Sequence, residues 1–187
     1  MAINPVKWTT KQFSRNYVAD YKPYNFVDGE GVRCSLYVSG CPFACKGCYN
    51  KIAQNFSYGQ AYSTDLENQI IEDLKAEYCQ GLTLLGGEPF LNTGVTIPLC
   101  RRVREEFGNE KDIWSWSGYT WEELLYEATG DKRDLLSLVD VLVDGRFELE
   151  EFDSNLTFRG SRNQRIIDVQ RSLEENQLLL WKDGRYN

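Results

Sequence analysis

The sequence has no histidine, one methionine and no long hydrophobic run. Without histidine, it lacks the commonest general base of enzymes and the nitrogen ligand of mixed zinc sites. Its apolar runs are too short to span a bilayer, so we expect no membrane partner. The formal net charge is −7, which leaves no basic field for nucleic acid. Residues 1–20 contain no apolar stretch typical of signal peptides, and we therefore expect a cytoplasmic protein.

The remaining composition is that of an ordinary globular protein. The chain has 187 residues, of which 42% are hydrophobic and 26% are charged. This length favours one domain with a sizeable core. The chain also contains six cysteines and no recognisable export signal. Cysteines in such a context favour a reducing compartment and metal ligation over disulfide bonds.

Three of the cysteines lie close together, at Cys41, Cys45 and Cys48. The preceding segment, Val32–Gly40, alternates apolar and polar side chains and therefore predicts a strand that ends in glycine. The three cysteines are thus expected on a loop just past the carboxyl end of a strand, where α/β proteins place their chemistry. A short loop brings three thiolates to one metal centre with little loss of chain entropy.

We call the loop that carries Cys41, Cys45 and Cys48 the cluster loop. No fourth ligand is evident for these three cysteines. A closed zinc site needs four ligands, and ordinary ferredoxin clusters also use four thiolates. Cys34, Cys79 and Cys100 lie within strand or helix patterns, and each is expected to be a small buried hydrophobic residue. Three thiolates on a cubane cluster would leave one iron open to another ligand. A zinc knuckle, or three unrelated loop cysteines, remains the alternative.

Helix and strand patterns alternate along the chain. The segments are helix 64–79, strand 81–85, a helix that starts near Pro98 and ends at Phe107, strand 112–117, a helix after Thr120, and strand 139–144. This alternation predicts an α/β fold with a parallel sheet. Segments 165–169 and 177–181 are candidates for further strands, whereas residues 1–21 show no regular pattern. No domain boundary is evident.

The stretch Gly86-Gly87-Glu88-Pro89 follows the predicted strand 81–85. Two glycines at a strand end let a ligand approach bare backbone, and a carboxylate can hold an ammonium group. Alone, the stretch is more typical of a turn between a strand and a helix. A binding role gains weight because the stretch follows the second predicted strand of a chain whose first predicted strand leads into the three cysteines.

The sequence resembles the radical S-adenosylmethionine (SAM) activases of glycyl radical enzymes, and among them the activating proteins of anaerobic (class III) ribonucleoside-triphosphate reductase. The matching stretches are Phe26–Arg33, Ser39–Asn50, Gly86–Pro89, Trp116–Glu123, Val141–Gly145 and Phe158–Arg165. The cysteine loop is typical of the superfamily, whereas the Ser-Gly-Tyr and Arg-Gly-Ser-Arg-Asn-Gln-Arg stretches point to the reductase activases.

The resemblance implies a fold, two cofactors and their ligands. The fold is an incomplete (β/α) barrel with about five or six parallel strands and helices outside, in a single domain 1–187 with short terminal extensions. Cys41, Cys45 and Cys48 would ligate one [4Fe-4S] cluster, and SAM would chelate the fourth iron. Gly86, Gly87 and Glu88 would hold the methionyl ammonium of SAM. Gly47, Cys48 and Tyr49 would line its adenine and ribose side. No catalytic residue is expected beyond the cluster and SAM.

The implied activity is reductive cleavage of SAM, after which the 5′-deoxyadenosyl radical takes a hydrogen atom from a glycine of the reductase. The implied partners are the large subunit of that reductase and a low-potential electron donor such as flavodoxin. Asp144, at a strand end, is a candidate to face the site. We expect the stretch Arg159–Arg165 to serve the site or the reductase, with a solvated loop as the alternative. The rival functions are activation of another glycyl radical enzyme, small-molecule radical SAM chemistry, and a zinc-binding interaction module.

Overall fold

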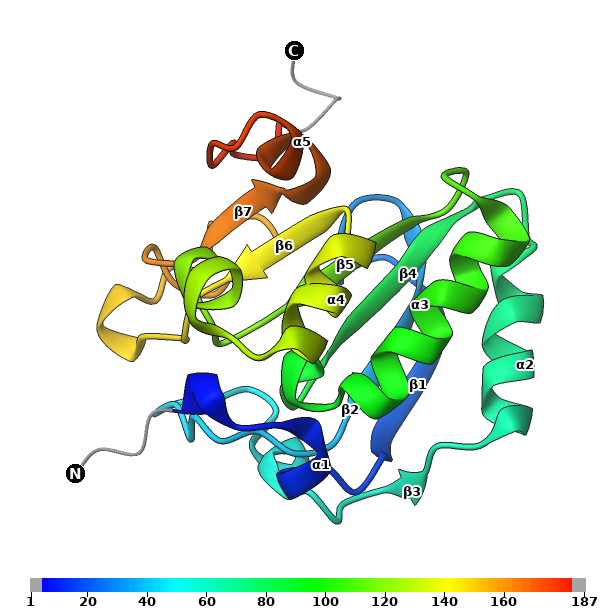
Figure 1. Ribbon diagram of the computed structural model, residues 1–187, viewed down its shortest axis with the longest axis horizontal. Helices are drawn as coiled ribbons and strands as arrows, with labels where there is room; N and C mark the ends of the chain where they lie inside the picture. The colour runs from blue at the N-terminus through cyan, green and yellow to red at the C-terminus, as the bar shows by residue number, and fades with distance from the viewer. Residues whose placement is uncertain (1–4, 183–187) are drawn as a thin grey trace.

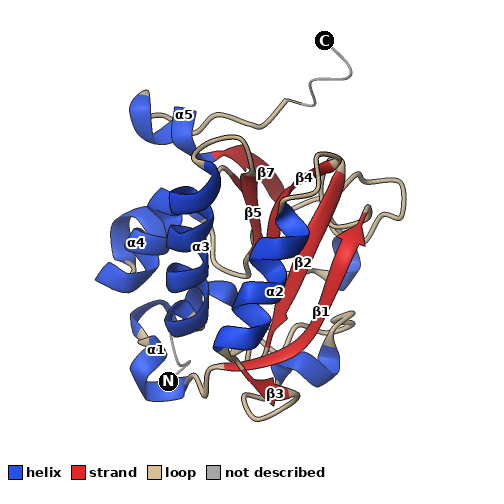
Figure 2. Cartoon of the chain, turned by 90° about the vertical axis from the view of Figure 1, so that its right-hand side faces the viewer, coloured by secondary structure: helices blue, strands red, loops and turns tan. Residues whose placement is uncertain are grey.

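The structure is a computed structural model that describes residues 5–182. A seven-stranded sheet crosses the molecule, and helices cover one of its faces (Figure 1, Figure 2). The strands are β1 (Tyr17–Asn25), β2 (Val32–Val38), β3 (Gln60–Ala61), β4 (Cys79–Gly86), β5 (Asp112–Trp116), β6 (Val141–Asp144) and β7 (Arg165–Asp168). The helices are α1 (Thr10–Phe13), α2 (Thr64–Leu74), α3 (Thr93–Phe107), α4 (Gly130–Leu138) and α5 (Val169–Glu174). Shorter helical turns are η1 (Pro5–Lys7), η2 (Lys51–Gln54), η3 (Pro89–Leu91), η4 (Glu123–Glu127) and η5 (Leu149–Glu151).

The strand order is β3-β1-β2-β4-β5-β6-β7. Strands β2, β4, β5 and β6 are parallel to their neighbours within this group, which confirms the predicted α/β class. Strands β1, β3 and β7 pair in antiparallel fashion at the two sides. Because the central strands share one direction, their carboxyl ends meet at one edge of the sheet.

The expected count of about five or six parallel strands is wrong, because four strands form the parallel set in residues 5–182. A parallel pair needs a long crossover connection, usually a helix. The turn 26–31 between β1 and β2 is too short for one, so these two strands form an antiparallel pair. The loop 145–164 before β7 contains the turn η5 and a bridge between Phe152 and Ser161 but no crossover helix, and β7 also runs antiparallel to β6.

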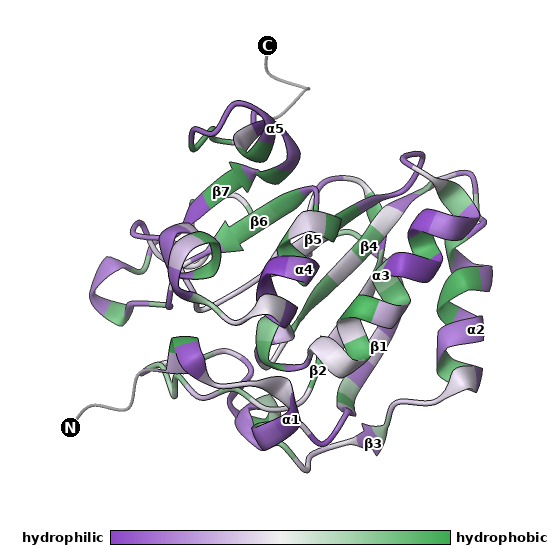
Figure 3. Ribbon diagram, viewed as in Figure 1, coloured by the Kyte–Doolittle hydropathy of each residue, from purple (hydrophilic) through white to green (hydrophobic). Residues whose placement is uncertain are grey.

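The main hydrophobic core lies between the sheet and its helices. One face of β2 contributes Cys34, Leu36 and Val38, which are fully buried. They pack in one cluster with apolar side chains of α2, α3 and α4. In Figure 3 the apolar colour follows the central strands, whereas much of the helix surface that faces away from them is hydrophilic. The alternation in 32–38 thus gives β2 its helix-facing side, as predicted.

Several predicted boundaries differ from the structure. Helix α2 ends at Leu74 rather than at residue 79, because Cys79 already belongs to β4. Helix α3 begins at Thr93, so Pro98 lies inside it with an exposed ring rather than near its start. Residues 177–181 form a single bridge, between Ile167 and Leu180, instead of a strand. Strand β1 begins at Tyr17, within residues 1–21, for which the sequence showed no regular pattern.

No helix among residues 5–182 combines the length and the apolar character needed to cross a membrane.

Candidate active site

A cavity of about 430 Å³ opens at the carboxyl ends of the four parallel strands. It is lined by every residue that the sequence analysis assigned to the cluster or to SAM, namely Cys41, Cys45, Gly47, Cys48, Tyr49, Gly86, Gly87 and Glu88. The cysteines come from the loop after β2 and the Gly-Gly-Glu stretch from the end of β4. The structure therefore brings two motifs that are far apart in the sequence to one cavity.

Backbone hydrogen bonds join the start of the cluster loop to the turn η2, which follows the loop. The N–H of Gly40 donates to the carbonyl of Ala53 at 2.7 Å, and that of Cys41 donates to Gln54 at 3.1 Å. Within the loop, the N–H of Cys48 donates to the carbonyl of Cys45 at 3.1 Å. These bonds fix the loop between β2 and η2, so the three thiols are presented by an ordered backbone.

All six cysteines are free thiols. Cys34, Cys79 and Cys100 are buried in the core, as the sequence predicts, and the Sγ atoms of Cys34 and Cys79 lie 3.7 Å apart. The cluster-loop cysteines are less buried and face the cavity. Burial raises the pKa of the Cys41 thiol, and the nearby Glu88 carboxylate raises it further. Burial also raises the pKa of Cys45. Cysteine must lose its proton to bind a metal, so metal ligation at these thiols displaces protons.

The glycines of the Gly-Gly-Glu stretch are required by close backbone contacts. Gly86 has a φ of +99°, which side chains rarely adopt. A Cβ on Gly87 would lie 2.5 Å from the carbonyl oxygen of Gly40 and 2.9 Å from that of Ala53. The N–H of Gly87 donates to Val38 at 2.7 Å, and the N–H of Glu88 donates to Gly40 at 2.8 Å. This stretch therefore fastens the start of the cluster loop to the end of β4.

The Glu88 carboxylate is fully buried and bound by its own chain. Its Oε1 accepts hydrogen bonds from the N–H of Phe90 at 3.0 Å and the hydroxyl of Ser117 at 2.9 Å. Its Oε2 accepts one from the N–H of Gly118 at 2.8 Å. Burial raises the pKa of this carboxyl from 4.5 to about 7, although the three donors favour the ionised form. Glu88 thus connects the ends of β4 and β5.

Part of the cavity wall was not assigned from the sequence. It comes from the ends of β5 and β6 and from the long loop before β7, and includes Trp116, Gly118, Phe147, Phe152 and Gln164. Trp116 and Gly118 belong to stretches that carry the family resemblance but had no assigned role, whereas Gln164 lies in the stretch 159–165 that was expected to serve the site or the reductase. The rule that ligands bind at the carboxyl ends of parallel strands was the signal that could have found the first two.

Asp144, a candidate from the sequence, does not line the cavity. Its buried carboxylate accepts a hydrogen bond from the N–H of Trp121 at 2.7 Å and pairs with the guanidinium of Arg165 at 2.5 Å. Arg165 also pairs with Glu122 at 2.8 Å. Asp144 and Arg165 therefore join the end of β6 to β7 beside the site.

The other arginines of the 159–165 stretch also bind within the chain. Arg159 donates to the carbonyl of Gln164 at 2.7 Å, and Arg162 pairs with Asp153 at 3.0 Å. Gly160 and Gln164 are the members that reach the cavity. The Gln164 amide donates to Gly145 and accepts from the backbone of Gly160. The stretch thus contributes bare backbone and one amide to the site.

The residues fit an iron–sulfur cluster with a further ligand. Among residues 5–182, no three carboxylate or thiol side chains are placed to hold a single metal ion. In a cubane cluster each thiolate binds a different iron, so the sulfurs surround the group instead of meeting at one point. The cavity has three thiols on one wall, bare glycine backbone on another, and a volume in the range of small-molecule sites.

Comparison with known proteins decides the family. A model described as a 4Fe-4S single cluster domain matches residues 27–167. An anaerobic ribonucleoside-triphosphate reductase-activating protein of Pasteurella multocida is 46% identical over 155 residues, which cover 81% of this chain and 96% of the relative. The chain belongs to this family of activating proteins. Relatives of the same name occur in Escherichia coli K12, at 40% identity over 77% of this chain and 93% of the relative, and in phage T4, at 37% identity over 81% and 92%. Membership of the activating-protein family favours an iron–sulfur cluster over zinc at the three cysteines.

Proposed function

We propose that this protein activates an anaerobic ribonucleotide reductase by reductive cleavage of SAM at a [4Fe-4S] cluster. The observation that carries the proposal is the shared cavity of the cluster-loop cysteines and the Gly-Gly-Glu stretch. The curated relatives, at up to 46% identity, carry the name of reductase-activating proteins. When bound, the cluster would supply one electron that splits SAM into methionine and a 5′-deoxyadenosyl radical, and this radical would take a hydrogen atom from a glycine of the reductase.

The residues of the chain bind and orient the two cofactors. Cys41, Cys45 and Cys48 hold three irons of the cluster by their thiolates. Gly47 and Tyr49 flank the adenine and ribose side of SAM. A Cβ on Gly47 would approach Leu149 and Phe147 to 3.2 and 3.3 Å, so this glycine keeps the loop closely packed against the opposite wall. Binding both cofactors side by side makes the electron transfer effectively unimolecular.

Gly86, Gly87 and Glu88 are proposed to hold the methionyl ammonium. The glycine backbone borders the cavity, and its carbonyl groups suit an ammonium donor. The Glu88 carboxylate already accepts three hydrogen bonds from the chain. It retains about one acceptor position and acts on the ammonium mainly through its charge. Glu88 therefore has a second task, which is to position the backbone around the ligand.

The mouth of the cavity suits a polypeptide substrate. Tyr49 is 99% exposed, Phe152 56% and Leu149 41%, and all three belong to segments that border the cavity. Exposed apolar side chains around a deep site are typical of protein interfaces. A glycine loop of the reductase would bury them as it enters. Glycine fits this reaction because it has no side chain to hinder access to its Cα.

The remaining expectations are proposals of the same kind. We propose that residues 1–187 act as one domain, that the open sheet corresponds to an incomplete barrel, and that the protein works in the cytoplasm, where free thiols persist. A low-potential donor such as flavodoxin would supply the electron. Neither nucleic acid nor membrane is an expected partner.

The test is anaerobic incubation of the reconstituted, reduced protein with SAM and the candidate reductase. Electron paramagnetic resonance should detect a glycyl radical on the reductase, and Cys45→Ala should give none. SAM cleavage with a radical only on a different glycyl radical enzyme would assign the activity to that partner. Zinc without iron and acid-labile sulfide would replace the proposal by a zinc-binding interaction module.

A further inference from the structure

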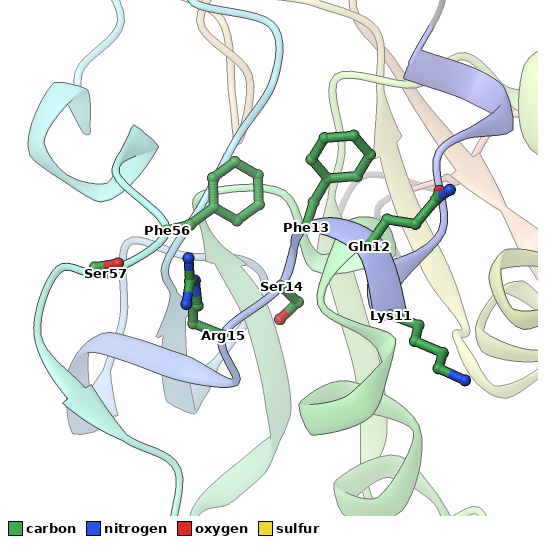
Figure 4. A pocket seen from close by; sticks show the side chains of 7 residues that line it. All are labelled: Lys11, Gln12, Phe13, Ser14, Arg15, Phe56 and Ser57. Carbon is green, nitrogen blue, oxygen red and sulfur yellow. The ribbon is translucent and has the colours of Figure 1, made fainter.

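A second hollow, of about 480 Å³, lies beside helix α1 and is distinct from the cluster cavity. It is lined by residues 11–15 and by Phe56 and Ser57. In Figure 4 the rings of Phe13 and Phe56 lie next to each other, and the Arg15 side chain lies beside Phe56. The two ring centroids are 6.4 Å apart. The hollow is therefore built from two segments that are about 40 residues apart in the sequence.

The wall of this hollow is the back of the cluster loop. The Phe56 ring lies directly against Gly40, where an added Cβ would be 2.0 Å from the ring. The next residue, Cys41, donates its N–H to the carbonyl of Gln54 at 3.1 Å. Gln54 itself lines the cluster cavity. The segment 40–57 therefore borders the hollow with Phe56 and Ser57 and the cluster cavity with Cys41 and Gln54.

The hollow is also electropositive in a chain of net charge −7. Lys11 and Arg15 are exposed, and within residues 5–182 neither forms an ion pair with a carboxylate. None of the described residues that line the hollow is acidic. Two half-buried aromatic rings with a rim of unpaired cations resemble the centre and rim of a transient protein interface. An acidic partner complements this surface.

We propose that this hollow is the docking site of an acidic protein that carries one electron to the cluster. The inference rests on the proposed function, because only a redox-active cluster behind Cys41 needs such a partner. One electron leaves the reduced carrier and enters the cluster, and no bond to this chain forms or breaks. The carrier is thereby oxidised by one electron and the cluster reduced by one. Because the hollow lies behind the cluster loop, the mouth of the cavity stays open to the reductase.

The experiment uses the reconstituted protein and purified flavodoxin as the acidic carrier. The double variant Lys11→Glu/Arg15→Glu is compared with the matched control Arg101→Glu/Lys182→Glu, which reverses two exposed cations outside the hollow. The first readout is the dissociation constant of flavodoxin at low and high salt. The second is the rate at which reduced flavodoxin reduces the cluster, followed anaerobically by its absorbance.

We expect the hollow variant to bind flavodoxin about tenfold more weakly at low salt, with a smaller loss at high salt, whereas the control keeps the wild-type affinity. Unchanged binding in the hollow variant, or equal losses in both variants, would overturn the proposal. If the charge reversal lowers the iron content, flavodoxin binding and cluster reduction are measured instead on Lys11→Gln/Arg15→Gln. The same outcomes then support or overturn the proposal. Iron content and dithionite-driven SAM cleavage of the wild type test the proposed function independently of the carrier.

Discussion

Replacing Glu88 by glutamine changes one atom at the junction of the two strand ends. The carboxylate accepts from three donors, two of them the N–H groups of Phe90 and Gly118. A protonated carboxyl can still accept at both oxygens, whereas the amide accepts at only one. At least one buried N–H therefore loses its partner in Glu88→Gln. Such a loss costs about 1–3 kcal/mol of the free energy of unfolding.

A second effect depends on pH and acts on the wild type alone. Burial raises the pKa of Glu88 from 4.5 to about 7 in the folded protein. The folded state therefore binds the proton more tightly than the unfolded state. This contribution to stability is complete below pH 4.5 and is lost as the pH rises through 7. Between pH 5 and pH 8 the loss amounts to about 2–3 kcal/mol.

We therefore expect Glu88→Gln to be less stable than the wild type by about 1–3 kcal/mol at pH 5, with the difference shrinking by about 2–3 kcal/mol at pH 8. The assay is urea unfolding of the metal-free, reduced proteins at several pH values. Taking the difference between the two proteins cancels the titrating groups that do not interact with Glu88. Glu72→Gln, at an exposed ion pair on α2, is the surface control and should change stability by less than about 0.5 kcal/mol.

A difference between wild type and Glu88→Gln that stays constant from pH 5 to pH 8 would refute the raised pKa. A difference that grows with pH would mean that the three donors outweigh desolvation, so that the folded protein favours the ionised carboxylate. In the reconstituted protein we expect the variant to keep its iron and to bind SAM more weakly. Unchanged SAM affinity would move the ammonium site away from Glu88.

Three further predictions concern the site and its supports. Alanine at any cluster-loop cysteine should abolish the iron–sulfur absorbance, whereas alanine at any of the three core cysteines should leave the iron content unchanged. Gly87→Ala forces a Cβ within 2.5 Å of the Gly40 carbonyl and should cost about 1–3 kcal/mol in urea unfolding, so a neutral result would contradict the close contact. Arg165→Ala leaves the Asp144 carboxylate buried without its partner and should cost about 3 kcal/mol, whereas Arg162→Ala, at an exposed pair, should cost about 0–1 kcal/mol; equal effects would refute the buried-pair interpretation.

The parts of the fold that could be predicted are those with local patterns. The alternation in 32–38 and the apolar run in 81–85 identify β2 and β4, because side chains in strands alternate and buried parallel strands are apolar on both faces. Strand β1 gave no such signal, since most of its residues are at least partly exposed. Its direction, like that of β7, depends on how the connecting loop turns, which side-chain periodicity does not encode.

The position of Pro98 illustrates how tertiary context overrides a local rule. Proline favours the first turn of a helix because it lacks an N–H, and this rule placed a helix start near residue 98. The structure begins α3 at Thr93, and the buried side chains of Val95 and Leu99 hold both sides of the proline in the same helix. Burial of this apolar face outweighs the one backbone hydrogen bond that the proline cannot donate. The proline ring is exposed to solvent, so it does not disturb the packing of that face.

The sequence predicted the residues of the two motifs in the candidate site but not the other residues that line the cavity. The stretch Arg159–Arg165 explains why. Its arginines suggest recognition of a charged ligand, yet each of them binds a carboxylate or a carbonyl of the chain, whose position only the fold determines. Gly160 and Gln164 are the members of the stretch that line the cavity. The Gln164 amide accepts a hydrogen bond from the N–H of Gly160 and donates one to the carbonyl of Gly145. The residues of this stretch that line the cavity are therefore uncharged, although the stretch looks charged in the sequence. It follows that substitutions at Gln164 should alter the cavity more than substitutions at the neighbouring Arg162, although arginine is the residue that sequence reasoning would choose.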